Sequence, residues 1–159
     1  MNRSLVVLFL LCVVTVCGAV DRGGQLDDIR EATFRYQFKK NASGQQQNAK
    51  VYFLTLFNQK EQQDEDPEDK FMKRFDGHKP RVAKVSQSKS SMPEGVQDKK
   101  TGEHGLIFTI TAIRWKSDEE VEVDGGYYEG SLSSSGNTYF LKRKGGKWIV
   151  ERDDMHWIS

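Results

Sequence analysis

The feature that most constrains the fold is a long stretch after Gly105 in which apolar and polar residues alternate. Leu106, Phe108, Ile110 and Ala112 occupy every second position, as in a strand with one buried face. Turn-forming residues interrupt the stretch at Ser117-Asp118, Ser133–Gly136 and Gly145-Gly146. The C-terminal third of the chain therefore predicts an antiparallel meander of long strands joined by short turns.

The turns also predict which residues pair across neighbouring strands. The expected pairs are Ala112 with Val123, Arg114 with Val121, Tyr128 with Leu141, Tyr139 with Arg152, Leu141 with Val150 and Arg143 with Trp148. These pairs share one inner face only if the alternation slips by one residue between Val123 and Tyr128. Gly125-Gly126 lies in that interval, so we expect a β-bulge at this glycine doublet.

The N-terminal half predicts helices and a buried strand. Apolar residues spaced by three and four predict a helix over 26–40, and Gly44 ends it. Residues 51–57 are apolar on both faces of a strand, which indicates cover on each side. A short second helix is predicted between Pro67, at a first helical position, and Gly77. Residues 82–87 predict a weaker strand, and residues 88–105 predict a polar loop.

Together these elements predict a single α+β domain over residues 20–159. Its N-terminal helix packs on a curved, mainly antiparallel sheet, in a cone-shaped roll with a short second helix.

Residues 1–19 predict a cleavable signal peptide. Arg3 supplies a short positive head, an apolar run of about a dozen residues follows, and the segment ends in small residues at Ala19. The run is too short to span a membrane, which needs ~20 apolar residues. A permanent anchor, or a lipid anchor on Cys17, is the alternative. We expect cleavage after Ala19, a secreted or periplasmic protein, and no membrane attachment afterwards.

Composition excludes several classes of function for the mature chain. Both cysteines, Cys12 and Cys17, lie in the predicted signal peptide, which excludes thiol catalysis and disulfides. Basic and acidic residues are balanced, so nucleic-acid binding by bulk electrostatics is excluded. His78, His104 and His156 lack metal-ligand spacing, and we expect no metal or cofactor. Asn41 begins a formal glycosylation sequon.

The order of elements over 25–159 resembles the nuclear-transport-factor-like and ketosteroid-isomerase-like group, often classed with cystatin-like folds. The tail is similar to small exported bacterial proteins of undefined function, through Gly126–Tyr128, Ser134–Tyr139, Gly146–Trp148 and His156–Ser159. The resemblance implies a helix across a concave sheet and a pocket at the open end of the cone, which in that group holds an acid/base pair, a ligand or only packing. Cystatin-type protease inhibition needs a Gln-x-Val-x-Gly loop, which this chain lacks.

Three functions remain as hypotheses, since fold does not decide function. The first is a binding module for a small ligand or a protein, with its site at the cone mouth lined by Tyr36, Arg114, Tyr128 and Arg152. The second is a small isomerase or hydrolase with acid/base residues among Asp124, Asp154 and His156. For Asp124 this requires a pKa raised by burial. The third is a dimeric interaction protein that uses an outer sheet face through Ile107, Ile113, Trp115 and Trp157.

Overall fold

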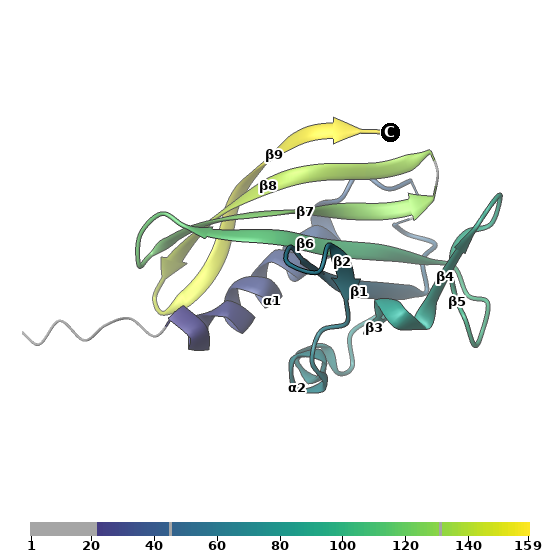
Figure 1. The fold of residues 1–159 in the computed structure, drawn as a ribbon, viewed down its shortest axis with the longest axis horizontal. Coiled ribbons are helices and arrows are strands. Elements are labelled where there is room, and N and C mark those ends of the chain that lie inside the picture. Colours follow the sequence, from purple (N-terminus) through teal and green to yellow (C-terminus); the bar gives the residue numbers. More distant parts are fainter. Residues whose placement is uncertain (1–21, 45, 131) are drawn as a thin grey trace, which may run out of the picture.

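The computed structural model describes residues 22–44, 46–130 and 132–159. A seven-stranded mixed sheet dominates the fold, with one long helix, α1, packed along one of its faces (Figure 1). A two-stranded sheet and a short helix, α2, complete the structure. The predicted α+β class, with one helix on a curved and mainly antiparallel sheet, is confirmed.

Four long antiparallel strands form the body of the sheet. They are β6 (Gly105–Trp115), β7 (Glu120–Gly130), β8 (Ser133–Lys144) and β9 (Lys147–Ile158), in this spatial order. Strand β1 (Val51–Asn58) extends the sheet and runs parallel to β6. The short strands β2 (Gln63–Glu65) and β3 (Arg81–Lys84) both pair with β1.

Helix α1 (Arg22–Lys40) and the sheet enclose the main core. Phe34 and Phe38 are buried beneath the helix, and Phe34 also contacts two aromatic rings of the segment formed by α2 (Asp69–Met72) and the 3₁₀ turn η1 (Lys73–Phe75). Burial of such aromatic side chains is the main contribution that attaches a helix to a sheet. The helix starts four residues before the predicted Leu26 and ends at the predicted Lys40.

A smaller core lies on the opposite face of the sheet. Val51, Phe53, Ala83 and Val96 are buried together there. Strand β1 therefore has cover on both faces, as its continuous apolar sequence predicts.

The polar segments contain more regular structure than expected. Within the predicted loop 88–105, β4 (Ser88–Ser91) and β5 (Gly95–Asp98) form a hairpin, and β2 lies in the predicted acidic loop. The strand predicted over 82–87 is β3 followed by the 3₁₀ turn η2 (Val85–Gln87). Helix α2 begins at Asp69 rather than Pro67. These short elements are held mainly by backbone hydrogen bonds. Their sequences therefore show little of the alternation of apolar and polar residues by which a strand is recognised.

The predicted register holds only close to one turn. Leu141 pairs with Val150 and Arg143 with Trp148, as predicted. The other pairs are wrong: Ala112 lies opposite Asp124, Arg114 opposite Glu122, Tyr128 opposite Ser134 and Tyr139 opposite Asp153. Each error follows from a turn or bulge at a position that the sequence does not mark. The β7–β8 turn, for example, lies between Gly130 and Ser133, so its strands are displaced by seven residues from the predicted pairing.

The irregularity expected at the glycine doublet lies on the neighbouring strand instead. The β6–β7 register shifts between Ile110 and Ala112, so Thr111 is the extra residue, while β7 and β8 pair without a break through Gly125 and Gly126. Val123 packs in the helix-side core and Tyr128 against the second core, hence on opposite faces. We predicted which side chains line the inner face by assuming a bulge at the glycine doublet, and that prediction is therefore wrong.

The predicted signal peptide lies outside the described residues. In the part of the chain that the structure describes, no helix is long and apolar enough to cross a bilayer.

Candidate functional site

The structure separates the four residues predicted to line a ligand site. Tyr36 lies on the α1 side of the sheet, where its hydroxyl donates a 2.7 Å hydrogen bond to the Asp153 carboxylate. Arg114 and Tyr128 lie on the other side and line one pocket there. Arg152 lies outside that pocket, with its side chain 56% exposed. The four predicted residues therefore do not line a common site at the open end of the fold.

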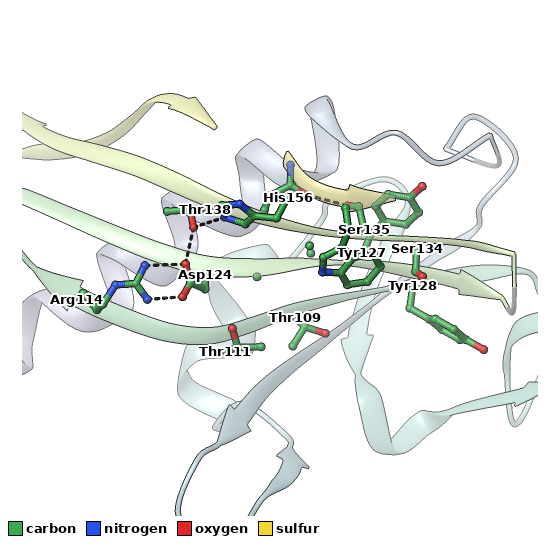
Figure 2. Close-up of a pocket in the computed structure, with 15 residues that line it drawn as sticks. Thr109, Thr111, Arg114, Asp124, Tyr127, Tyr128, Ser134, Ser135, Thr138 and His156 are labelled. Atoms are coloured by element: carbon green, nitrogen blue, oxygen red, sulfur yellow. Dashed lines mark hydrogen bonds and ion pairs between the residues drawn. The ribbon is translucent and has the colours of Figure 1, made fainter. Parts of the chain in front are cut away.

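A pocket of about 630 Å³ lies on the sheet face opposite α1, and we call it the outer-face pocket. Strands β6, β7, β8 and β9 all contribute to it (Figure 2). Its lining side chains include Thr109, Thr111, Arg114, Asp124, Tyr128, Ser134, Thr138, His156 and Trp157.

Glycines form the floor of this pocket. Gly126 lies directly opposite Gly136, so two adjacent strands present no side chain at the same level. At Gly126, a Cβ atom would stand 1.8 Å from the Ser135 carbonyl oxygen, and at Gly125 another would stand 2.2 Å from the Thr109 carbonyl oxygen. The doublet is thus required because β7 approaches both neighbouring backbones too closely for a side chain.

A chain of polar contacts crosses the pocket from β6 to β9. The guanidinium of Arg114 donates to both carboxylate oxygens of Asp124, through Nη1 and, at 2.8 Å, through Nη2. Thr138 Oγ1 donates a 2.6 Å hydrogen bond to Asp124 Oδ1 and lies 2.8 Å from His156 Nε2. Figure 2 shows the four side chains converging in this order.

The proton positions in this chain follow from its geometry. The Thr138 hydroxyl has one hydrogen, which it donates to Asp124, so His156 Nε2 must carry the hydrogen that joins it to Thr138. A nucleophilic threonine needs an imidazole that accepts its proton, and this arrangement is the reverse. The residues therefore hold one another in place rather than activate a nucleophile.

Asp124 does not have the properties that the enzyme hypothesis requires of it. The hydrogen bonds from Arg114 lower the pKa of this carboxyl, and they outweigh the effect of partial burial. The enzyme hypothesis requires a pKa raised by an apolar surrounding, and this condition is not met at Asp124. Asp124 is an ionised, paired carboxylate at neutral pH.

A second bulge brings His156 into the pocket. The β8–β9 register shifts between Gly136 and Asn137, and His156 is the extra residue between Met155 and Trp157. The other catalytic candidate, Asp154, lies outside the pocket, and its carboxylate pairs with Arg152 at 2.6 Å. The two residues that we considered as an acid/base pair are therefore not joined by any contact among the described residues.

A separate polar network lies beneath α1. Asp153 accepts hydrogen bonds of 2.7 Å from both the Tyr36 hydroxyl and the Asn137 side-chain amide. Burial, together with the bond to Asp153, raises the pKa of Tyr36 to about 12. Gln37 is buried at 1% exposure, and its Nε2 donates to the Thr109 carbonyl oxygen at 3.2 Å. This network fixes the helix on the sheet.

Sequence reasoning missed most of the outer-face pocket. Thr109, Thr111 and Thr138 were not singled out, although polar β-branched residues within strands are a recognisable signal of a hydroxyl-lined sheet face. Asp153 was missed because a bulge at Glu151, between Val150 and Arg152, reverses the alternation predicted for β9.

The residues of the predicted dimer surface do not form one patch. Ile113 and Trp115 pack against the helix-side core, and Ile107 packs against the second core. Trp157, at 54% exposure, remains accessible. Within the described ranges, no group of three or more His, Cys, Asp or Glu residues is arranged to hold a metal ion.

Comparison of the chain with models of protein families, with curated proteins and with solved structures found no match. The resemblance to the ketosteroid-isomerase-like group therefore stays a prediction, and the fold is described by its architecture alone.

Proposed function

We propose that this chain is an exported binding protein that takes up a small polar molecule in the outer-face pocket. The observation that carries the proposal is a pocket with polar side chains around the glycine floor at Gly126 and Gly136, where the half-exposed indole of Trp157 covers Gly136. A sheet face normally fills such a level with two side chains, so their absence leaves room for the Trp157 ring and, beside it, for a ligand.

The size and rigidity of the pocket support binding. A volume of about 630 Å³ lies within the range of about 300–1,000 Å³ that is typical of small-molecule sites. Arg114, Asp124, Thr138 and His156 are held by one another and by paired strands, which lowers the conformational entropy that is lost when a ligand binds.

The proton arrangement favours binding over catalysis. Asp124 is ionised and fully occupied by Arg114 and Thr138, and the Thr138 hydroxyl already donates its hydrogen. Neither group is free to exchange a proton with a substrate without first losing a partner.

The proposal is tested by saturation-transfer NMR of the purified protein with a diverse fragment library. The probe variants are Trp157→Ala and Gly136→Val. At Gly136 the three atoms nearest to a new Cβ all belong to the half-exposed Trp157 side chain, which can move, so this variant can fold with its floor filled. Gly44→Ala is the control, since nothing lies within 4 Å of its Cβ.

We expect fragments that bind the original protein and the control but lose binding in both pocket variants. The proposal fails if no fragment binds, or if every bound fragment is insensitive to both pocket substitutions. Far-UV circular dichroism of each variant verifies the fold.

A further inference from the structure

We infer that the outer-face pocket binds a neutral saccharide, with one sugar ring stacked on Trp157; this inference rests on the proposed function and names its ligand class. The argument uses three properties of the pocket: an accessible aromatic ring, unpaired hydrogen-bonding groups, and a cancelled charge.

Trp157 is a large aromatic side chain that the fold leaves accessible. It is 54% exposed, although the strand that carries it is paired along its length with β8. Its indole lies over Gly136, with Nε1 2.3 Å from the position of a Cβ atom there, so glycine is what lets the ring approach the sheet. A sugar ring has an apolar face of C–H groups, and an exposed indole offers the complementary apolar surface.

Hydroxyl groups without partners line the same pocket as this ring. The side-chain hydroxyls of Thr109 and Thr111 have no hydrogen-bond partner among the described residues, and neither does the indole N–H of Trp157. Each terminal nitrogen of Arg114 carries a second N–H besides the one that it donates to Asp124. Donors and acceptors that share one pocket with an aromatic ring match a ligand with several hydroxyl groups, since each hydroxyl both donates and accepts.

The charges at the pocket cancel, which argues against an anionic ligand. The cation of Arg114 is shared between Asp124 and Glu122, and Lys116 lies 3.4 Å from Glu122. Within the pocket lining the guanidinium of Arg114 is paired with the Asp124 carboxylate, and the neighbouring pair of Lys116 and Glu122 lies outside that lining. A phosphate or sulfate site needs a surplus of donors with positive charge, and this cluster has none.

The test is a titration of the purified protein with maltotriose, cellotriose, mannotriose and tri-N-acetylchitotriose, monitored by tryptophan fluorescence and saturation-transfer NMR. We expect at least one of these neutral probes to bind, with transfer of magnetisation to its ring C–H protons. Trp157→Ala should weaken that binding by about tenfold or more, the equivalent of one aromatic contact, while Trp157→Phe retains part of it. Thr111→Val, which replaces a hydroxyl by a methyl group, should weaken it by about threefold.

Trp115→Phe is the matched control, because Trp115 packs edge-on against Trp148 on the α1 side. It should leave saccharide binding unchanged. The inference is overturned if none of the four probes binds, or if the one that binds is insensitive to Trp157→Ala. Anionic or other polar fragments that bind the pocket without any saccharide would overturn the ligand class and leave the proposed function standing, whereas a pocket that binds no fragment overturns both.

Discussion

His156 and Trp157 are consecutive in the sequence, yet both line the same pocket. Neighbouring residues of a regular strand point to opposite faces, so this arrangement requires the bulge that inserts His156 between Met155 and Trp157. The bulge gives the pocket a hydrogen-bonding group, which reaches Thr138, and beside it an aromatic ring over Gly136.

The glycine floor leads to a steric prediction. Gly126→Ala brings a Cβ atom within 1.8 Å of the Ser135 carbonyl oxygen, and backbone cannot move as a side chain does. We expect a loss of about 3 kcal/mol or more in the free energy of unfolding, or failure to fold. Gly44→Ala should change it by less than about 0.5 kcal/mol. Urea denaturation measures both, and equal stabilities would contradict the close approach of β7 and β8.

The ion pair of Arg114 with Asp124 predicts a dependence on acidic pH. Arg114 lowers the pKa of Asp124 from its ordinary 3.8, so the stabilising contribution is present above pH 3.8 and is lost as the pH falls through the lower folded-state value. Asp124→Asn should therefore cost about 1 kcal/mol at pH 7, since the pair is partly exposed, and progressively less below pH 4. Asp154→Asn, which alters an exposed pair, is the control. A cost that does not vary with pH would refute the assignment.

Tyr36 predicts the opposite dependence, at alkaline pH. Its pKa is raised from 10.0 to about 12, so its contribution is complete below pH 10 and is lost between pH 10 and 12. Tyr36→Phe removes the hydrogen bond to Asp153 and should destabilise the protein by about 1–2 kcal/mol at pH 7.

The difference in the free energy of unfolding between Tyr36→Phe and the original protein should then shrink above pH 10, as measured by urea denaturation. Tyr128→Phe, whose hydroxyl lies 3.3 Å from Ser90 Oγ on the exposed side, should have a smaller effect. If the two variants behave alike, the network beneath α1 does not contribute as described.

Gln37 predicts a strong penalty for charge beneath the helix. Its Nε2 donates to the carbonyl oxygens of Thr109 and Gly126 and to the Tyr139 hydroxyl, and it is almost fully buried. Gln37→Glu keeps the shape but sets a carboxylate against two carbonyl oxygens. We expect a loss of about 3 kcal/mol or more at pH 7, which diminishes as the pH falls and the carboxyl gains a proton.

Gln37→Met also loses the hydrogen bonds but introduces no charge. Urea denaturation of both variants therefore separates the cost of changed packing from the cost of the buried charge. The cost of Gln37→Met should be smaller and independent of pH. A Glu variant no less stable than the Met variant at pH 7 would mean that this position reaches water.

Export predicts a defined N-terminus. The protein recovered from the secreted or periplasmic fraction should begin at Val20, after cleavage behind Ala19, and intact mass spectrometry measures this directly. An arginine at Leu8, in the middle of the apolar run, should retain the full-length chain in the cell. Recovery of uncleaved protein outside the cell would contradict a cleavable signal.

Much of the fold could be predicted because local patterns carry it. The period of the apolar residues located α1, and the doubly apolar run located β1 with cover on both faces. The register was correct next to Gly145-Gly146, where both glycines have positive φ and define a two-residue turn. Beyond Val150 the prediction was lost, because the extra residue Glu151 in β9 reverses the side chains that follow it, up to the second bulge at His156.

The sequence alone determined the class of fold, the long helix, the buried first strand and the absence of cysteine chemistry after residue 19, since each depends on composition or on spacing within one segment. Which face Arg114, Tyr128 and Asp153 occupy was decided only by the tertiary structure. The position of a bulge depends on the fit between two different strands, as at Thr111, which lies between the pairs Ile110–Gly125 and Ala112–Asp124. A pattern read along one strand does not contain that fit, so the outer-face pocket emerges only when the four strands are assembled.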